Sequence, residues 1–244
     1  MRNLRGRIAA RSGLCVTTSN VEPRSRLSSR NSYSVAGNYT WSKFMQADEL
    51  LNPADPFPLR DISDQDNPHR FSLSSVWELP FGKNLAFLST SNPVASRLVG
   101  GWQISGIFGY QVAAPLAWGN VLYIGDPKGM ILPAGERTVD HWINTAGFEK
   151  ASALQLVNNL RTWPLRFSQI RGRNSNNVDI ALIKNTSITE SRSLQFRAEA
   201  LNAFNHPGFP GPVLTPTSTT FGTVVASNQA GYPRRLQLTL KYIF

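Results

Sequence analysis

The sequence predicts an all-β fold of antiparallel strands, each with one apolar face and one polar face. The segment 234–244 shows this pattern best, because Leu, Tyr and Phe alternate there with Arg, Gln, Thr and Lys. No run of about eighteen apolar residues occurs, which excludes a transmembrane helix. The connections between strands are alternately long and short. Together these observations are typical of an up-and-down transmembrane β-barrel, whose strands turn apolar side chains to lipid and polar ones to the lumen.

The alternation of apolar and polar residues predicts six long strands. The first is followed by an acidic, proline-rich stretch at 46–69, where the density of proline excludes both a helix and a central strand. The third is the clearest after the last, since Trp, Ile, Phe and Tyr alternate there with Gln and Ser. The expected strands are residues 33–41, 70–79, 102–112, 178–184, 194–204 and 234–244. Six strands form an open sheet, because about eight are needed to close a membrane barrel.

The connections after the first, third and fifth strands are long, and those after the second and fourth are short. The long ones are 46–69, then 113–176, with a short helix expected near 151–160, and 205–232, with a short strand expected at 221–226. Outer-membrane barrels have long extracellular loops and short periplasmic turns. A soluble sandwich gives no reason for this alternation and usually lacks irregular loops of this length.

The positive charge of the chain is concentrated at its start. Hydrophobic residues make up 41% and charged residues 16%, and the net charge is +10. Residues 1–30 hold seven arginines and one glutamate, a net +6. Such an arm could bind nucleic acid or anionic lipid. It has neither interleaved aromatics nor a nucleic-acid motif, so we expect a disordered or misassigned basic segment and no nucleic-acid partner. It also lacks the apolar core of a signal peptide.

The residues that could carry chemistry do not form a recognised site. Cys15 is alone, which excludes an internal disulfide, and no GxSxG, P-loop or HExxH motif occurs. The histidines His69, His141 and His206 fall in separate predicted loops. The acids Asp48, Glu49, Asp55, Asp61, Asp64 and Asp66 are dense enough for Ca²⁺ but lack the spacing of a calcium loop, which favours solvated loop charge. We therefore expect no enzyme activity, no catalytic or metal-binding residue and no cofactor.

One pair of charges is expected on the polar face of the fifth strand. Arg197 and Glu199 are two residues apart and so share a face. In a barrel lumen they could pair with neighbouring strands or with a plug domain. Ordinary polarity of the lumen also explains them, and we favour that interpretation.

Several stretches of the sequence resemble a known family. They are NYTWSK at 38–43, DNPHRF at 66–71, LVGGWQISGI at 98–107, FRAEALNAFNHP at 196–207 and PRR at 233–235. They resemble the C-terminal barrel of Oar-like TonB-dependent outer-membrane receptors, which carry a carboxypeptidase-regulatory-like domain. The resemblance covers about 31–244 and implies a barrel of about 22 strands around a plug, in the outer membrane of a Gram-negative cell.

The last strand resembles the signal that the barrel assembly machinery reads. Gln237, Tyr242 and Phe244 match its polar and aromatic positions, and Thr239 stands where glycine is usual. We therefore expect these three residues to act as the barrel-assembly signal.

The resemblance implies a division of the chain and a set of partners. Residues 31–244 would be the C-terminal part of the receptor barrel, an inactive fragment of a parent that imports an unidentified substrate. The expected partners are outer-membrane lipid, the remaining barrel and plug, the assembly machinery, and the TonB complex through N-terminal parts only. The alternative is a soluble β-sandwich that acts as a binding or adhesion module. Solubility without detergent would favour the sandwich, and fractionation with outer membranes would favour the barrel.

Overall fold

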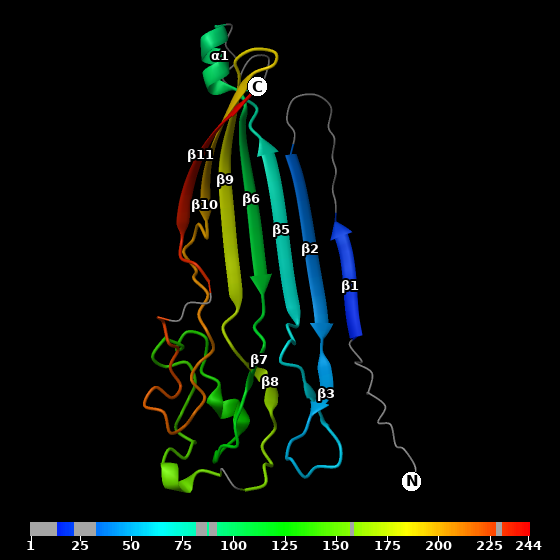
Figure 1. Ribbon diagram of the computed structural model, residues 1–244, viewed down its shortest axis with the longest axis vertical. Helices are drawn as coiled ribbons and strands as arrows, with labels where there is room; N and C mark the ends of the chain where they lie inside the picture. Colours follow the sequence, from blue (N-terminus) through cyan, green and yellow to red (C-terminus); the bar gives the residue numbers. More distant parts are fainter. Residues whose placement is uncertain (1–13, 22–32, 82–86, 88–91, 157–158, 228–230) are drawn as a thin grey trace.

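The computed structural model describes residues 14–21, 33–81, 87, 92–156, 159–227 and 231–244. Its main element is a seven-stranded antiparallel sheet in the order β1-β2-β5-β6-β9-β10-β11, whose strands run along the long axis of the molecule (Figure 1). The strands are β1 (Leu14–Val21), β2 (Tyr33–Lys43), β5 (His69–Glu78), β6 (Trp102–Gln111), β9 (Ser175–Ser187), β10 (Ser193–Leu201) and β11 (Arg235–Ile243).

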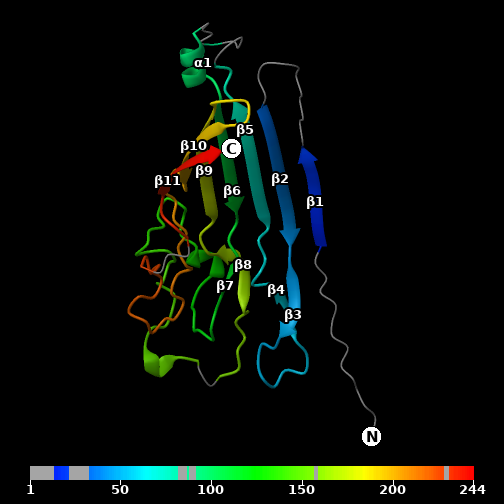
Figure 2. The same cartoon turned by 45° about the horizontal axis from the view of Figure 1, so that its top comes forward.

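All six expected strands are present, and the sheet is open. In the described part of the chain, β1 pairs only with β2 and β11 only with β10. Figures 1 and 2 show β9, β10 and β11 overlapping while β2, β5 and β6 lie side by side, so the sheet bends toward the β11 edge.

The seventh strand, β1, lies in the basic segment and was not expected. Its register pairs Val16 with Trp41 and Thr17 with Thr40 of β2. A run of Thr, Ser and Asn follows Val16, so the apolar alternation that marks the other strands is missing. The structure describes these eight residues as a strand, and the expectation of a disordered or misassigned segment at 1–30 stays a prediction. Residues 1–13 and 22–32 of the same segment lie outside the described part of the chain.

The long connections all lie at one end of the sheet, which we call the loop end, and the short ones lie at the other, the turn end (Figure 1). We call the three long connections, 44–68, 112–174 and 202–234, the loop cap. The first contains the hairpin β3 (Met45–Glu49) and β4 (Leu59–Ile62), and the second contains β7 (Pro115–Ala117) and β8 (Arg166–Arg171). The predicted placement of the three long connections at one end is confirmed, but the β5–β6 connection, 79–101, is nearly as long as 44–68, so the alternation of lengths is not strict.

Two smaller predictions in the cap are wrong. The helix expected near 151–160 is only a 3₁₀ turn, η2 (Ser152–Leu154), and a second 3₁₀ turn, η1 (Pro127–Met130), lies earlier. The strand expected at 221–226 does not form. Its backbone instead bonds to other cap segments, since the Val224 N–H donates to the Val139 carbonyl at 2.7 Å. Tertiary contacts thus replace a regular ladder.

The connection from β5 to β6 contains a helix, α1 (Pro93–Val99), that the sequence did not predict. The Asn92 side chain caps it by accepting from the N–H groups of Val94 and Ala95. Gly101 then starts β6 at φ +75°, and a Cβ there would collide with the carbonyl oxygen of Asn185. Glycine is required at this close approach.

The register divides the side chains of the sheet into two chemically different faces. The face that we call apolar carries Tyr33, Val35, Tyr39, Trp41, Phe71, Leu73, Trp77, Trp102, Ile104, Phe108, Tyr110, Val178, Ile180, Leu182, Leu194, Phe196, Ala198, Ala200, Leu236, Leu238, Leu240 and Tyr242. The opposite, polar face carries mainly Ser, Asn, Thr, Gln, Arg, Lys, Asp and Glu, with Ile107 and Ile243 among its exceptions.

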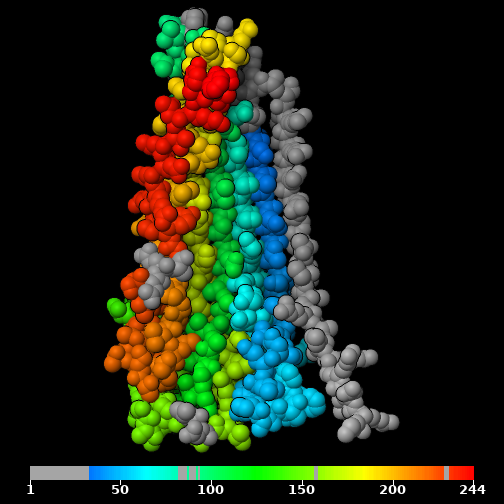
Figure 3. All heavy atoms as spheres, in the orientation of Figure 1, coloured from blue at the N-terminus to red at the C-terminus, as the bar shows by residue number. Residues whose placement is uncertain are grey.

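The hydrophobic core lies in the loop cap rather than against the sheet. The core cluster consists of Leu116, Trp118, Val121, Met130, Ile143, Phe148 and Ile170. Figure 3 shows the cap as a filled mass of atoms at one end of the long, narrow sheet. Among the described helices, none has the length and apolar character needed to cross a membrane.

Candidate functional site: a membrane interface and a loop cap

The apolar face is uncovered over most of its area. On β11 the side chains of Leu236, Leu238 and Leu240 are 76%, 72% and 67% exposed, and no described element packs on them. A soluble sandwich would cover such a face with a second sheet, and the two small two-stranded sheets lie at the loop end instead. A contiguous apolar surface of this extent marks contact with protein or lipid.

Two bands of aromatic residues border the apolar face. At the turn end lie Tyr33, Trp77, Trp102 and Tyr242, and at the loop end lie Tyr39, Trp41, Phe71 and Tyr110. Within β2 and within β6 the bands are eight residues apart, about 26 Å at the usual rise of a strand. Barrel strands tilt by about 35–45°, so this length spans about 20 Å of the apolar band, which is about 25 Å tall in membrane barrels.

The aromatics of the loop-end band find polar partners at its outer border. The Tyr39 hydroxyl lies 2.8 Å from His69 Nδ1, and the two rings stack. The Tyr110 hydroxyl accepts from the Asn174 side-chain amide at 2.9 Å. Aromatic rings with one apolar body and one polar tip favour the membrane–water boundary. His69 therefore belongs to this boundary.

The polar face is bonded internally. Arg197 and Glu199 form an ion pair at 2.6 Å with each other, along the same strand. Between strands, the Gln195 amide donates to the Asn185 side-chain oxygen. Near the loop end, Asp179 accepts from the Asn177 side chain and from the Asn202 N–H. The charges expected on this face are present and pair with each other, although Nε of Arg197 is buried without a hydrogen-bond partner among the described residues.

The loop cap is a packed unit with an aromatic centre. Trp118 stacks on Phe148 with ring centroids 5.3 Å apart, and Tyr123 and Phe221 contact the other sides of Phe148. Met130 beside them is fully buried. The sequence predicted irregular loops here. The structure shows instead that the second and third long connections share one core. Burying the aromatic rings of both connections away from water stabilises this arrangement.

A buried ion pair joins the first long connection to the second. Asp66 is 1% exposed, and its carboxylate lies 2.6 Å from Arg171 Nη2. The same carboxylate accepts from the Phe44 N–H, and Arg171 also donates to the carbonyls of Asp66 and Ala113. Because the guanidinium binds the carboxylate with one nitrogen and backbone carbonyls with another, these charge-assisted hydrogen bonds fix geometry as well as charge. The prediction of solvated loop charge is therefore wrong for Asp66.

A second ion pair lies further out on the same boundary. Arg166 meets both carboxylate oxygens of Glu49, at 2.7 and 3.1 Å. The hydrogen bond from Arg166 holds the pKa of Glu49 below its ordinary value, and the hydrogen bond to Glu49 raises the pKa of Arg166. The Arg166 N–H also donates to Asp61. Glu49 and Asp61 therefore position the second connection and are not free surface charges.

Arg161 completes the junction from inside the cap. Its guanidinium donates to the carbonyls of Trp118, Trp163 and Pro164, and Asn52 bonds its backbone on both sides. Burial lowers the pKa of Arg161. The described residues contain no group of three His, Cys, Asp or Glu that could hold a metal ion. The sequence contained one signal for this junction. Arg161, Arg166 and Arg171 are spaced five residues apart, and their charge is opposite to that of the acidic stretch in the first connection.

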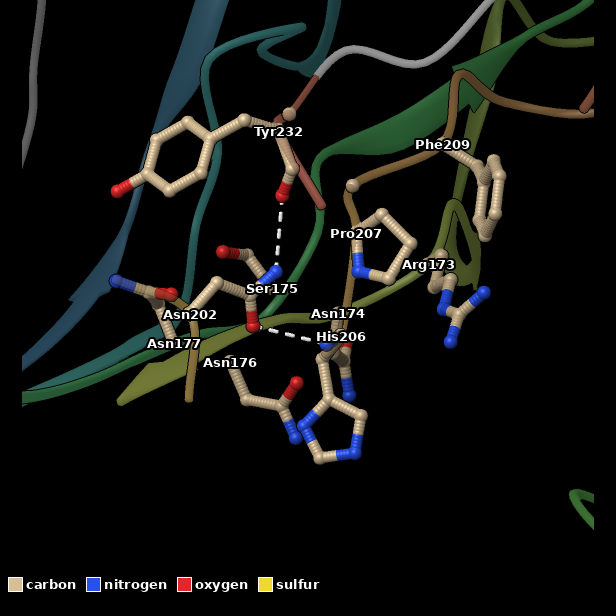
Figure 4. Close-up of a pocket in the computed structure, with 12 residues that line it drawn as sticks. Arg173, Asn174, Ser175, Asn176, Asn177, Asn202, His206, Pro207, Phe209 and Tyr232 are labelled. Carbon is tan, nitrogen blue, oxygen red and sulfur yellow. Dashed lines mark hydrogen bonds between the residues drawn. The ribbon is translucent and has the colours of Figure 1, made fainter. Parts of the chain in front are cut away.

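The motif around Asn202 shapes a polar pocket where β9 and β10 meet the cap. Asn202 and Asn205 have φ of 50° and 54°, a conformation that asparagine tolerates better than most residues. The Asn202 side chain accepts from the His206 N–H and donates to the Tyr232 carbonyl (Figure 4). The pocket has a volume of about 410 Å³, and its lining includes Arg173, Asn176 and His206. His206 thus lies in an open, polar rim, apart from His69 and His141.

Comparison with protein families identifies the fold that these surfaces belong to. The profile of a family described as an outer membrane beta barrel domain matches residues 21–237. The chain belongs to this family. It is therefore located in the outer membrane, where its apolar face meets lipid. No curated protein and no solved structure matches the chain.

The three residues of the expected assembly signal lie on both faces of the last strand of this barrel domain. Gln237 is on the polar face, opposite Glu199. Tyr242 and Phe244 stack at the turn end with ring centroids 6.1 Å apart, and Phe244 is 92% exposed. The structure brings the two aromatics together and leaves both accessible on the edge strand. Their role as a signal stays a prediction.

Proposed function

We propose that the chain is the C-terminal part of the barrel of an Oar-like TonB-dependent receptor, whose parent imports a substrate across the outer membrane. The observation that carries this proposal is the combination of a lipid-facing open sheet with a packed cap on its long loops. Two of the stretches that resemble the family also have defined places here. NYTWSK ends β2 in the loop-end aromatic band, and the stretch ending in NHP shapes the pocket rim.

Further strands are needed to complete this structure in a membrane. The outer edges of β1 and β11 present backbone N–H and C=O groups, and each unsatisfied group in lipid costs several kcal/mol. The rest of the parent barrel would pair with these edges, and its plug would contact the polar face. On this proposal the piece by itself neither transports nor responds to inner-membrane energy.

The barrel-domain family is typically non-enzymatic, and the proposed role is transport rather than catalysis. The polar face with Arg197 and Glu199 would line the lumen. The cap would bind or admit the substrate from outside, because long loops carry recognition in many scaffolds.

The test is isolation of the protein from native outer membranes in mild detergent. We expect it to copurify with the remaining barrel strands and the plug, either as parts of the same polypeptide or as a separate polypeptide bound to it. We also expect the immobilised periplasmic domain of TonB to retain it. A protein that is soluble without detergent would instead support the alternative, a soluble β-sandwich that acts as a binding module. A detergent-requiring protein that never binds TonB would leave a barrel but overturn the receptor assignment.

The assembly signal has its own test. We propose that Gln237, Tyr242 and Phe244 are recognised by the barrel assembly machinery, which reads the exposed edge strand. Phe244→Asp should strongly lower the amount of protein inserted in outer membranes, measured by fractionation and immunoblot. Ile243→Asp, on the polar face one residue earlier, is the matched control and should insert near the normal level. Normal insertion of Phe244→Asp would refute the assignment.

A further inference from the structure

Helix α1 presents an uncovered apolar surface at the turn end. Val94 and Leu98 are four residues apart and so lie on the same side of the helix. They are 67% and 69% exposed, while Ala95, Ser96 and Val99 are partly buried. Arg97, next to Leu98, is also exposed. A short helix with apolar residues on one side and a cation beside them has the chemistry of a membrane-surface element.

The end of this helix is fixed to the lipid-facing side of the sheet. Lys184 lies on the apolar face, paired in register with Trp102. Its ammonium donates to the carbonyls of Arg97 and Gly100, where α1 ends, and lies over the Trp102 ring. The Trp102 indole N–H donates to the Leu98 carbonyl at 3.3 Å. The carbonyls at the end of α1 thus provide hydrogen-bond acceptors for a lysine on the lipid-facing surface. The same hydrogen bonds fix the position of the helix.

The position of α1 matches the border of the membrane. Trp102 belongs to the turn-end aromatic band, and Figures 1 and 2 place α1 at the same end, beyond the strands. The C-terminal end of α1, held by Lys184 and Trp102, therefore lies at the border of the apolar face that meets lipid. Short turns of outer-membrane barrels lie on the periplasmic side, so the neighbouring leaflet is the inner one.

We propose that α1 is an interfacial anchor in the inner leaflet of the outer membrane. Val94 and Leu98 enter the boundary between headgroups and acyl chains, and Arg97 extends to the phosphates of the phospholipids. The anchor rests on the membrane interface that the family establishes and does not depend on TonB coupling or on the substrate. Its effect is to fix the depth of the β5–β6 end of the sheet in the bilayer.

The test places one fluorescent label at a chosen position, which is possible because the sequence contains a single cysteine that can be replaced. In a Cys15→Ser background, one new cysteine is placed at Leu98 and labelled with the environment-sensitive fluorophore NBD. The matched control is Ile124→Cys, since Ile124 is an apolar cap residue that is 79% exposed. Leu238→Cys, 72% exposed on the apolar face, reports the lipid core. Each protein is extracted from outer membranes and reconstituted in phosphatidylethanolamine–phosphatidylglycerol vesicles that contain nitroxide lipids labelled at shallow or deep positions.

We expect the label at 98 to be quenched by shallow nitroxides about twofold or more above the label at 124, because interfacial helices lie roughly 5–10 Å into the headgroup boundary. The label at 238 should be quenched best by deep nitroxides. A label at 98 that behaves like 124 would show that α1 stands in water. A label at 98 that is shielded from water yet unquenched would show a protein partner there. Either result overturns the anchor while quenching at 238 upholds the membrane interface, and loss of quenching at 238 would instead refute the interface itself.

Discussion

In the loop cap, Met130 and Phe148 are almost completely buried, whereas in the sheet Leu236 and Leu238 are exposed over about three quarters of their surface. Of the buried hydrophobic residues in the described chain, only Ala181 lies in the seven-stranded sheet. The two regions therefore remove apolar surface from water in different ways. The cap packs its rings against one another, and the sheet presents its apolar side chains to lipid.

The two regions also treat charge differently. In the cap, Asp66 and Arg171 are joined across the boundary between two connections and are shielded from water. In the sheet, Arg197 and Glu199 pair along one strand on the polar face. Charge thus connects separate segments in the cap, while in the sheet the backbone ladder joins the strands and the Arg197–Glu199 pair lies within one strand. Stability of the cap should depend on its side chains, and stability of the sheet on its surroundings.

The largest expected effect is a cavity in the core of the cap. Phe148→Ala removes the ring that stacks on Trp118 and contacts Phe221, and should destabilise the cap by about 3–5 kcal/mol. Hydrogen exchange in membrane-reconstituted protein should rise in the cap peptides and stay unchanged in the strand peptides. Phe57→Ala, at a cap position that is 78% exposed, is the control and should have little effect. Equal loss of protection in sheet and cap would contradict the independence of the two regions.

The second effect concerns the buried ion pair. Asp66→Asn retains an acceptor for the Phe44 N–H but leaves the Arg171 charge unpaired, which should cost about 3 kcal/mol. The cleavage rate of segment 44–68 by an external protease would measure the separation of the first connection from the second. Asp64→Asn, at an exposed acid two residues earlier, should leave the rate unchanged. An unchanged rate in Asp66→Asn would mean that the pair does not hold the cap together.

A third prediction tests the two faces of one strand. Leu238→Arg places a charge on the lipid-facing side and should destabilise the inserted protein by about 2 kcal/mol, at the low end of the usual range because arginine can reach the interface. Thr239→Arg changes the neighbouring residue on the polar face and should be nearly neutral. Urea unfolding in lipid vesicles, followed by tryptophan fluorescence, would compare the two. A larger loss for Thr239→Arg would reverse the assignment of the faces.

The smallest effect is the pH dependence of the outer ion pair. The folded pKa of Glu49 lies below its unfolded value, so the stabilisation is present above the unfolded pKa and is lost as pH falls through the folded one. Because Glu49 is 43% exposed, the pair should contribute about 1 kcal/mol or less. Protease cleavage of the cap should therefore increase slightly below about pH 4. Glu49→Gln should remove that step, and a step of unchanged size in this variant would assign it to another group.

The sequence by itself determined six of the seven strands of the main sheet and the end at which the long loops lie. The alternation at 234–244 and 102–112 marks β11 and β6 almost to the residue, because a strand with two different environments needs a period of two. The lengths of the connections divided the sheet into a loop end and a turn end. At one boundary that moved, a backbone cause is visible: β10 ends at Leu201 because Asn202 takes a positive φ.

Only the tertiary structure decided the cap, β1 and α1. Trp118, Met130 and Phe148 follow no period, because residues in an irregular core need only meet in space. Glu49 and Arg166 are 117 residues apart, and nothing local in either segment requires the other. β1 is defined by its ladder with β2, and α1 by Asn92 and by its contact with Lys184. A periodic pattern records the environment of a strand, whereas a contact between distant segments exists only once the chain has folded.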